Sequence, residues 1–294
     1  MSGLSGLSPA AEPAVREHRT SSVAPSAFGD DFRRFVNLTW TLAVTDFKLR
    51  YFGSILGYVW SLMRPLLFFG ILYIVFTKVF GLGAGVYGYP LYLLTGIMFW
   101  TFFLEATAGC VTCLVGREGM LRKMRFPRLV IPFAVVLTAL FNLATNLVAV
   151  LVFALASGHM PRVTWLEMPV LIALLAVLAL GVGMVLSVLY VRFRDIQPIW
   201  DVVAQALFYA TPILWPLSRL HPSQHLLKHA LMSSPLAAIQ VQMYKAFIKP
   251  SAPSAFDAVG GGIRILLPIG LIVVMFGLGL WLFNREAPRI AENL

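Results

Sequence analysis

The segment Gly116–Arg128 reads GREGMLRKMRFPR and separates two long apolar segments, Tyr89–Val115 and Leu129–Ala156. It carries the densest charge in the chain, and its five basic residues face a single acidic one, Glu118. Each flanking segment exceeds the roughly 20 apolar residues that a helix needs to cross a bilayer. Short connections rich in Lys and Arg are retained in the cytoplasm. The pattern therefore predicts two membrane-spanning helices joined by a cytoplasmic loop, and this loop orients the rest of the chain.

The composition assigns the whole chain to the same class. Its 294 residues are 59% hydrophobic and 12% charged, and the mean hydropathy is +0.81. Soluble domains are less apolar and more charged. The net charge of +10 is explained by basic residues retained beside spans and by attraction to anionic lipid headgroups. We therefore expect an integral membrane protein, in contact with membrane lipids and without a nucleic-acid partner.

Two cysteines, Cys110 and Cys113, lie inside an apolar segment. The C-x-x-C spacing also occurs in redox and zinc motifs, but the sequence holds no second pair. We interpret both as helix-packing residues and expect no metal site. Residues 1–31 are rich in Ser, Ala, Pro and Gly and lack the apolar core of a signal peptide. We expect a disordered cytoplasmic tail there.

The hydrophobic pattern predicts an all-α polytopic membrane protein with six transmembrane helices. An even number of spans places both termini in the cytoplasm, with residues 290–294 as a short tail after a membrane domain that covers 32–289. A Gly-x-Gly pattern at Gly181 and Gly183 falls in mid-span, where small residues favour close helix packing. The expected spans are 55–80, 89–115, 129–156, 170–191, 198–215 and 263–283.

An amphipathic helix is expected before the first span, at 32–51. Its apolar stripe falls at spacings of four and three, and polar residues occupy a different face. An interfacial position suits Trp40 and the basic residues, while an ordinary solvent-facing helix is the alternative. The stripe consists of Phe32, Val36, Trp40, Ala43 and Phe47.

Two short external helices are expected between the fifth and sixth spans, beginning at Pro222 and Pro235, because proline is favoured in a first helical turn. Neither is long enough to cross, so we expect re-entrant helices that dip into the membrane rim. The triple glycine Gly260–Gly262 then frees the chain to enter the last span. This external side is not free of basic residues, since Lys245 and Lys249 lie on it.

Several segments in order make the chain similar to a known family. They are DFKLRY at Asp46–Tyr51, LGYVW at Leu56–Trp60, LRKMRFPRLVIP at Leu121–Pro132, YVRFRDI at Tyr190–Ile196 and TPILWP at Thr211–Pro216. The chain resembles the type-2 ABC transporter permeases that export polysaccharides, in particular the O-antigen and teichoic-acid group. The resemblance covers about 32–289. SSPLAAIQVQMYKAF at Ser233–Phe247 also matches, with Ser234 where the family commonly has Asn.

The resemblance implies a homodimer of six-span permeases in the bacterial plasma membrane, with two copies of a separate ATP-binding subunit, that moves a lipid-linked glycan outward. ATP and Mg²⁺ would bind to that partner and no cofactor to this chain. The sequence agrees, because it contains no G-x-x-x-x-G-K-[ST] phosphate loop.

In the family, the helix between spans two and three docks in a cleft of the ATPase. Here, charged residues would meet acidic rims of that cleft, and Met120, Leu121 and Met124 would fill it. Alternatively, the basic residues only fix the orientation of the chain in the membrane. The coupling residues implied are Arg117, Met120, Leu121, Arg122, Lys123, Met124, Arg125 and Phe126, with Arg192, Arg194 and Asp195 as a second, smaller contact.

Lys48, Arg50 and Arg64 cluster in sequence where the interfacial helix meets the first span. A lipid-linked glycan presents its phosphate at headgroup depth, and Lys and Arg bind such oxyanions through charge-assisted hydrogen bonds. The residues are candidates for a substrate headgroup site. Anchoring to anionic lipid explains them equally well.

Glu105 is the one acidic residue deep in a span, and intramembrane carboxylates face a cavity or a partner. It either lines the glycan path or pairs with a neighbouring helix. The aromatic residues Phe69, Tyr73 and Trp100 are further candidates for this path, although each ring can equally pack against helices. His221, His225 and His229 recur every four residues, but no carboxylate or cysteine lies nearby in sequence, so we assign no metal to them.

Other functions fit the sequence less well. A drug or small-lipid exporter of the same superfamily would keep the basic loop but would not need a wide lumen. A membrane-embedded glycan enzyme would need paired acids near a membrane face, for which Asp195 and Asp201 are the weak candidates. A secondary transporter would show repeated halves and more buried charges.

Overall fold

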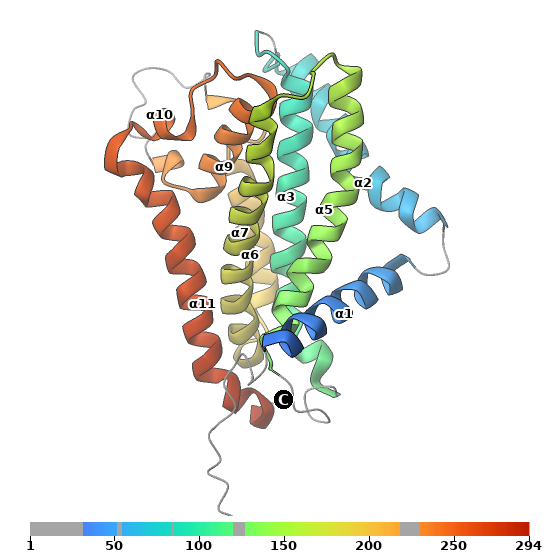
Figure 1. Cartoon of the computed structure of the whole chain (residues 1–294), viewed down its shortest axis with the longest axis vertical. Coiled ribbons are helices and arrows are strands. Elements are labelled where there is room, and N and C mark those ends of the chain that lie inside the picture. The colour runs from blue at the N-terminus through green and yellow to red at the C-terminus, as the bar shows by residue number, and fades with distance from the viewer. Residues whose placement is uncertain (1–31, 52–54, 84, 120–126, 218–229, 294) are drawn as a thin grey trace, which may run out of the picture.

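The computed structural model describes residues 32–51, 55–83, 85–119, 127–217 and 230–293, and the regular elements in these residues are all helices (Figure 1). The α-helices are α1 (Phe32–Tyr51), α2 (Ile55–Ile74), α3 (Tyr89–Thr112), α5 (Val130–Ala156), α6 (Glu167–Arg192), α7 (Ile196–Ala210), α9 (Pro235–Met243), α10 (Ala255–Val259) and α11 (Leu266–Asn293). Shorter helical turns are η1 (Val75–Val79), η2 (Val115–Arg117), η3 (Val163–Leu166), η5 (Tyr244–Ile248) and η6 (Gly262–Ile265).

Within the described residues, five helical segments are long and apolar enough to cross a membrane. The chain is thus a multi-pass membrane protein, and the part of it that the structure describes is helical. The second and third expected spans match α3 and α5 to within a turn, and the first is α2 continued by the π-helical turn η1. The five segments are Val59–Val79, Tyr89–Thr112, Val130–Ala156, Val163–Arg192 and Gly262–Glu286.

The expected fifth span, 198–215, contains a shorter helix than we predicted. Helix α7 has 15 residues, about 22 Å at 1.5 Å per residue, and therefore falls short of the roughly 30 Å of hydrocarbon in a bilayer. Its end has a local cause. Thr211 precedes Pro212 and adopts an extended conformation, as residues before proline do.

The chain nevertheless continues along α3 after α7 ends. The ring of Trp200 lies 6.3 Å from that of Phe103, and Phe208 lies 5.4 Å from Trp100. Farther along, the Tyr89 hydroxyl donates to the carbonyl of Leu214 at 2.8 Å. Since Tyr89 is the first residue of α3, residues 196–214 run antiparallel to α3 over most of its length.

Helix α3 forms the centre of the bundle. Figure 1 shows it between α5 and α6, with α2 and α11 at opposite sides. In its most apolar window 78% of the residues are buried, against 6% for the first segment and 17% for the last. The apolar outer faces of α2 and α11 are thus available to lipid or to another protein chain.

Glycines set the spacing of the helices around α3. A Cβ at Gly181 of α6 would lie 2.7 Å from the backbone nitrogen of Phe276 on α11, and one at Gly279 would lie 2.6 Å from the carbonyl oxygen of Gly181. A Cβ at Gly183 would meet Cys110 of α3 at 2.8 Å. The packing role predicted for Gly181, Gly183 and Cys110 is confirmed.

Helix α1 crosses the lower part of the bundle obliquely (Figure 1). Its buried face, with Phe35, Thr39 and Ala43, packs on α5, and the ring of Phe35 lies 5.3 Å from that of Phe133. The predicted apolar stripe is therefore divided: Ala43 faces the bundle, while Phe32 and Trp40 are 73% and 56% exposed. Phe35 and Thr39, which the stripe left out, lie on the contact face, while the rings of Trp40 and Phe47 from the stripe still lie 5.4 and 5.7 Å from that of Phe141 on α5.

The segment between α7 and α11 caps the upper end of the bundle (Figure 1). Helix α9 begins at Pro235 as predicted, and Ile239, Met243 and Phe247 are buried. The Thr164 hydroxyl donates to the carbonyl of Ala246 at 2.6 Å, which ties η3 to η5. The other short helix, expected at Pro222, lies outside the described residues.

The last span was predicted to follow a run of three glycines and to end before residue 290. Gly260, Gly261 and Gly262 all have positive φ angles, 103°, 71° and 60°, as the predicted release of the chain before the last span requires. The helix continues to Asn293. It therefore extends beyond the expected span, and residues 290–293, predicted as a tail, belong to it.

Candidate functional site

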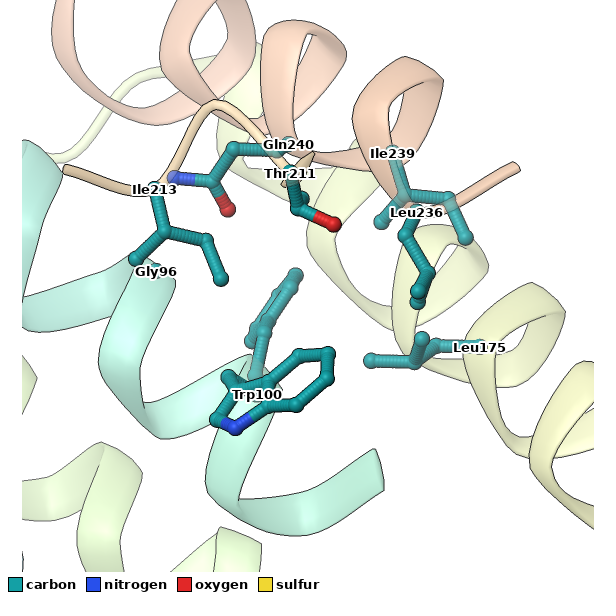
Figure 2. A pocket seen from close by; sticks show the side chains of 9 residues that line it. Gly96, Trp100, Leu175, Thr211, Ile213, Leu236, Ile239 and Gln240 are labelled. Carbon is teal, nitrogen blue, oxygen red and sulfur yellow. The ribbon is translucent and has the colours of Figure 1, made fainter. Parts of the chain in front are cut away.

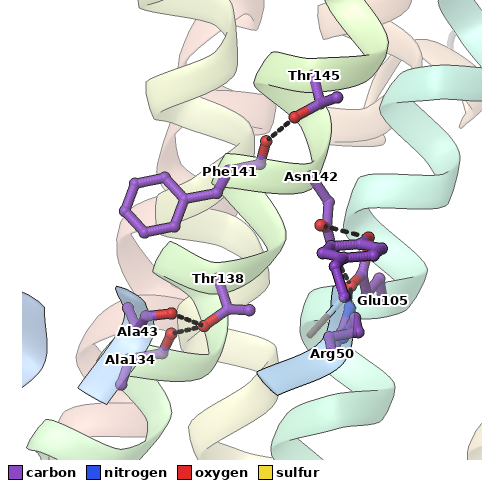
Figure 3. Close-up of polar contacts among 9 residues, drawn as sticks. Ala43, Arg50, Glu105, Ala134, Thr138, Phe141, Asn142 and Thr145 are labelled. Atoms are coloured by element: carbon purple, nitrogen blue, oxygen red, sulfur yellow. Dashed lines mark hydrogen bonds and ion pairs between the residues drawn. The ribbon is translucent and has the colours of Figure 1, made fainter. Parts of the chain in front are cut away.

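Three helices bring polar side chains together at Glu105 (Figure 3). Arg50, in the last turn of α1, forms an ion pair with the Glu105 carboxylate of α3. Asn142 of α5 donates its amide to the same oxygen, Oε1. The Tyr51 hydroxyl in turn donates to Oδ1 of Asn142 at 2.9 Å. Residues from three distant parts of the sequence thus form one network, which we call the Glu105 network: Arg50, Tyr51, Glu105 and Asn142.

The network offsets the cost of a carboxylate inside a membrane-spanning helix. Such a group costs several kcal/mol in order of magnitude when it lacks partners. Glu105 has both a cation and a neutral donor. The Glu105 side chain is 26% exposed and that of Arg50 48%, so the pair lies at the surface of the bundle. Of the two roles considered for Glu105, pairing with a neighbouring helix is what the structure contains; lining the glycan path stays a prediction.

A second ion pair holds the start of the basic loop. Arg117, at the end of η2, pairs with Asp46 of α1. Asp46 and Arg50 lie one helical turn apart, so α1 contacts α3 and η2 through two pairs of opposite polarity. The other residues proposed for ATPase coupling in this loop lie outside the described residues: Met120, Leu121, Arg122, Lys123, Met124, Arg125 and Phe126.

Arg128, the last basic residue of the loop, is described. Burial lowers the pKa of its guanidinium, but arginine starts from so high a value that it stays charged near neutral pH. The loop therefore keeps its positive charge up to the first turn of α5.

The second contact proposed for the ATPase lies at the same end of the bundle as the basic loop. Gly183 of α6 packs against Cys110 of α3, so the C-terminal halves of the two helices lie together. Arg192, Arg194 and Asp195 follow and are exposed. The guanidinium of Arg194 lies 5.1 Å from the ring centre of Tyr190. The basic loop and the pair Arg192 and Arg194 thus lie at one end of the bundle.

The three candidate headgroup residues differ in their surroundings. Lys48 of α1 and Arg64 of α2 are exposed. Arg50, by contrast, is engaged with Glu105. The ion pair of Arg50 with Glu105 was not predicted. Because Glu105 occupies the guanidinium, it competes with any phosphate that Arg50 could bind.

The aromatic candidates for the glycan path lie in two places. Phe69 and Tyr73 stack on α2 with ring centres 5.7 Å apart, and Phe69 packs against Phe153 of α5 at 6.0 Å. Trp100 is 7% exposed and faces α7. The structure therefore does not bring the three rings into one surface of the single chain.

Trp100 lines a small pocket instead (Figure 2). Gly96, Thr211 and Gln240 also border it. Gln240 is 3% exposed, and its amide nitrogen has no hydrogen-bond partner among the described residues. Gln240 was not predicted as a site residue, although a glutamine inside the apolar stripe of α9 was a signal that could have revealed it.

No group of three or more His, Cys, Asp and Glu side chains that could hold a metal occurs in the part of the chain that the structure describes. His221, His225 and His229 lie outside that part. Cys110 and Cys113 are buried and free, in agreement with the packing role assigned to them.

Comparison with known proteins gives the family. Residues 37–247 match the family model described as ABC-2 type transporter. The chain belongs to this family. The matched range contains the whole Glu105 network, the basic loop and α9, so these features all lie within the ABC-2 domain. With its apolar helices, membership indicates a multi-pass protein of the bacterial inner membrane.

Curated relatives of this ABC-2 chain carry transport names. It is 29% identical over 223 residues to the O-antigen export system permease protein RfbA of Myxococcus xanthus, covering 76% of this chain and 84% of that protein. It is 29% identical over 250 residues to the protein of that name from Klebsiella pneumoniae, covering 85% and 92%. It is 21% identical over 248 residues to the polysialic acid transport protein KpsM of Escherichia coli, covering 84% and 93%.

Proposed function

We propose that the chain is the permease subunit of an ABC exporter that moves a lipid-linked polysaccharide outward across the inner membrane. The observation that carries the proposal is the match to relatives named for O-antigen export and polysialic acid transport, which extends over most of both chains. The apolar helical bundle and the two basic groups at one of its ends support the proposal. The glycan is an O-antigen, a teichoic acid or a similar envelope polymer.

The proposed architecture has six crossings and both termini in the cytoplasm. Residues 196–214 are the fifth crossing, formed by α7 and the non-helical turns after it, because their contacts follow α3 to its first residue. The segment with α9 and α10 then lies outside, where it dips into the membrane rim. A homodimer encloses the path, and the exposed apolar faces of α2 and α11 are available for that contact.

ATP hydrolysis belongs to a partner. The sequence has no phosphate-binding loop of the G-x-x-x-x-G-K-[ST] type, so two copies of a cytoplasmic ATP-binding subunit, carrying ATP and Mg²⁺, drive the transport. They dock on the basic loop through Arg122, Lys123 and Arg125, and on Arg192 and Arg194 beside it. Lys48, Arg50 and Arg64 receive the phosphate of the lipid carrier.

Assembly with the ATPase tests this division of labour. The purified chain should show no ATP turnover, and turnover should appear when the ATP-binding subunit encoded with it is added. The combined change Arg122→Glu and Arg125→Glu should weaken association strongly, because like charges across an interface cost several kcal/mol in order of magnitude. Co-purification and ATPase assays measure both effects.

The control is Lys249→Glu, a charge reversal in the segment that we place outside the membrane. It should leave association unchanged. Turnover by the isolated chain, or a full yield of complex with the doubly reversed loop, would contradict the proposal.

A further inference from the structure

The ion pair between Arg50 and Glu105 uses one atom of each side chain. Arg50 reaches Glu105 through one nitrogen, Nη1, and one oxygen, Oε1. A guanidinium has five N–H donors in a planar fork, and nearly half of this side chain, 48%, is exposed. The cation thus has donors left over and a surface from which a second anion can approach.

Glu105 also has a donor that does not depend on Arg50. Asn142 donates to the same oxygen, and its own carbonyl is held by the Tyr51 hydroxyl. If Arg50 moved away, Glu105 would keep a fixed hydrogen bond from α5. Release of Arg50 would therefore leave the carboxylate with a donor, which lowers the cost of separating the pair.

Phosphate and pyrophosphate are better partners for a guanidinium than a carboxylate held at one point. They accept two parallel N–H bonds and carry more negative charge. We propose that Arg50 and Glu105 form an exchangeable pair in which the phosphate or pyrophosphate of a lipid that carries no cation of its own displaces Glu105 from Arg50. The inference rests on the proposed function, because it assigns the regulation of the headgroup site to Glu105.

The depth of the pair fits such a ligand. Helix α3 has 24 residues, about 36 Å in length, against about 30 Å of hydrocarbon. Glu105 lies about 10 Å before the end of α3, which is about 7 Å inside the hydrocarbon boundary when the helix is centred in the bilayer. Long basic side chains reach from this depth to the headgroup layer, where a lipid presents its phosphate.

In this arrangement Glu105 acts as an internal competitor. A zwitterionic lipid such as phosphatidylcholine, whose choline balances its own phosphate, does not replace Glu105 and leaves the pair closed. A lipid whose phosphate or pyrophosphate keeps its net negative charge opens the pair and removes one of the two ionic contacts of α1 with α3 and η2; the other, between Asp46 and Arg117, remains. The headgroup thereby changes how α1 is held beside the basic loop.

A competitor and a ligand-binding residue have opposite mutational effects. We would reconstitute the full chain in phosphatidylcholine nanodiscs and titrate it with farnesyl diphosphate, an isoprenoid lipid with a pyrophosphate. Glu105→Gln should tighten binding several-fold, and Arg50→Ala should weaken it about tenfold or more, the scale of a lost charge-assisted contact. The double variant should bind like Arg50→Ala. Glu167→Gln is the matched control, since Glu167 pairs with Gln242 in the external part, and it should bind like the unchanged chain.

The binding of Glu105→Gln decides whether the exchange occurs. Unchanged or weaker binding by Glu105→Gln would overturn the exchange. If that variant does not fold, Glu105→Asp, which keeps the charge on a shorter stem, should loosen the pair and tighten binding. Nanodiscs doped with phosphatidic acid identify the source of the phosphate: competition with farnesyl diphosphate means that bulk anionic lipid also opens the pair, and no competition means that the site selects the isoprenoid pyrophosphate.

The binding assay is independent of transport. Opposite effects of the two variants without any glycan export would support the exchange and contradict the proposed function. Normal export without the opposite effects would contradict the exchange alone.

Discussion

Asn142 determines how Glu105 can be accommodated at its depth in the bundle. Its amide serves Glu105 and its carbonyl accepts from Tyr51, so each polar end of this buried residue is satisfied. The sequence pointed to Glu105, because an acidic residue in an apolar span is conspicuous. It could not identify Arg50, Tyr51 and Asn142 as partners in this network, since Asn142 meets Glu105 only through the packing of α5 on α3, and Arg50 and Tyr51 join them only through the crossing of α1.

Removal of one hydroxyl tests the network. Tyr51→Phe leaves the Asn142 carbonyl buried without its donor, which costs about 1–3 kcal/mol. We expect lower thermal stability of the chain in detergent, measured by the loss of monodisperse protein after heating. Tyr209→Phe is the matched control, because Tyr209 is 58% exposed. Equal stability of both variants would show that the Tyr51 bond contributes nothing measurable.

At the scale of the helix, apolar length predicted α3 and α5 well, because a long uninterrupted run admits one interpretation. The bounds were predicted less well where a residue inside the apolar segment ends the helix. At Thr211 the following proline ends α7 early. The contact face of α1 was also missed in part. Its packing on α5 uses Thr39, a polar residue whose hydroxyl bonds to the carbonyl of Phe35 in its own helix.

The contact of α6 with α11 gives a test at this scale. Gly181→Ala would place a methyl group 2.7 Å from a backbone nitrogen and push the helices apart, so the variant should unfold at a lower temperature. Gly277→Ala is the control, since no atom lies within 4 Å of its added Cβ and alanine favours a helix by about 1 kcal/mol over glycine. A variant at Gly181 as stable as that at Gly277 would contradict the close packing.

For the whole molecule, the number of crossings depends on α7. We predict that Gln197→Cys reacts with a membrane-impermeant maleimide only after permeabilisation, whereas Ser251→Cys reacts in intact spheroplasts. The native cysteines are buried and should give a low background. Labelling of both positions from one side would mean that residues 197–251 do not cross, and the proposed six spans would be wrong.

The function itself is a property of the assembled transporter, which the sequence indicated through motifs spread over the chain rather than through any single site. The most direct measurement is ATP-dependent uptake into inside-out proteoliposomes that contain the chain and its ATP-binding subunit. The account predicts that a fluorescently labelled lipid-linked glycan becomes protected from an added glycosidase when ATP is supplied, whereas a small cationic dye does not accumulate. Accumulation of the dye, with the glycan left fully accessible to the glycosidase, would contradict it.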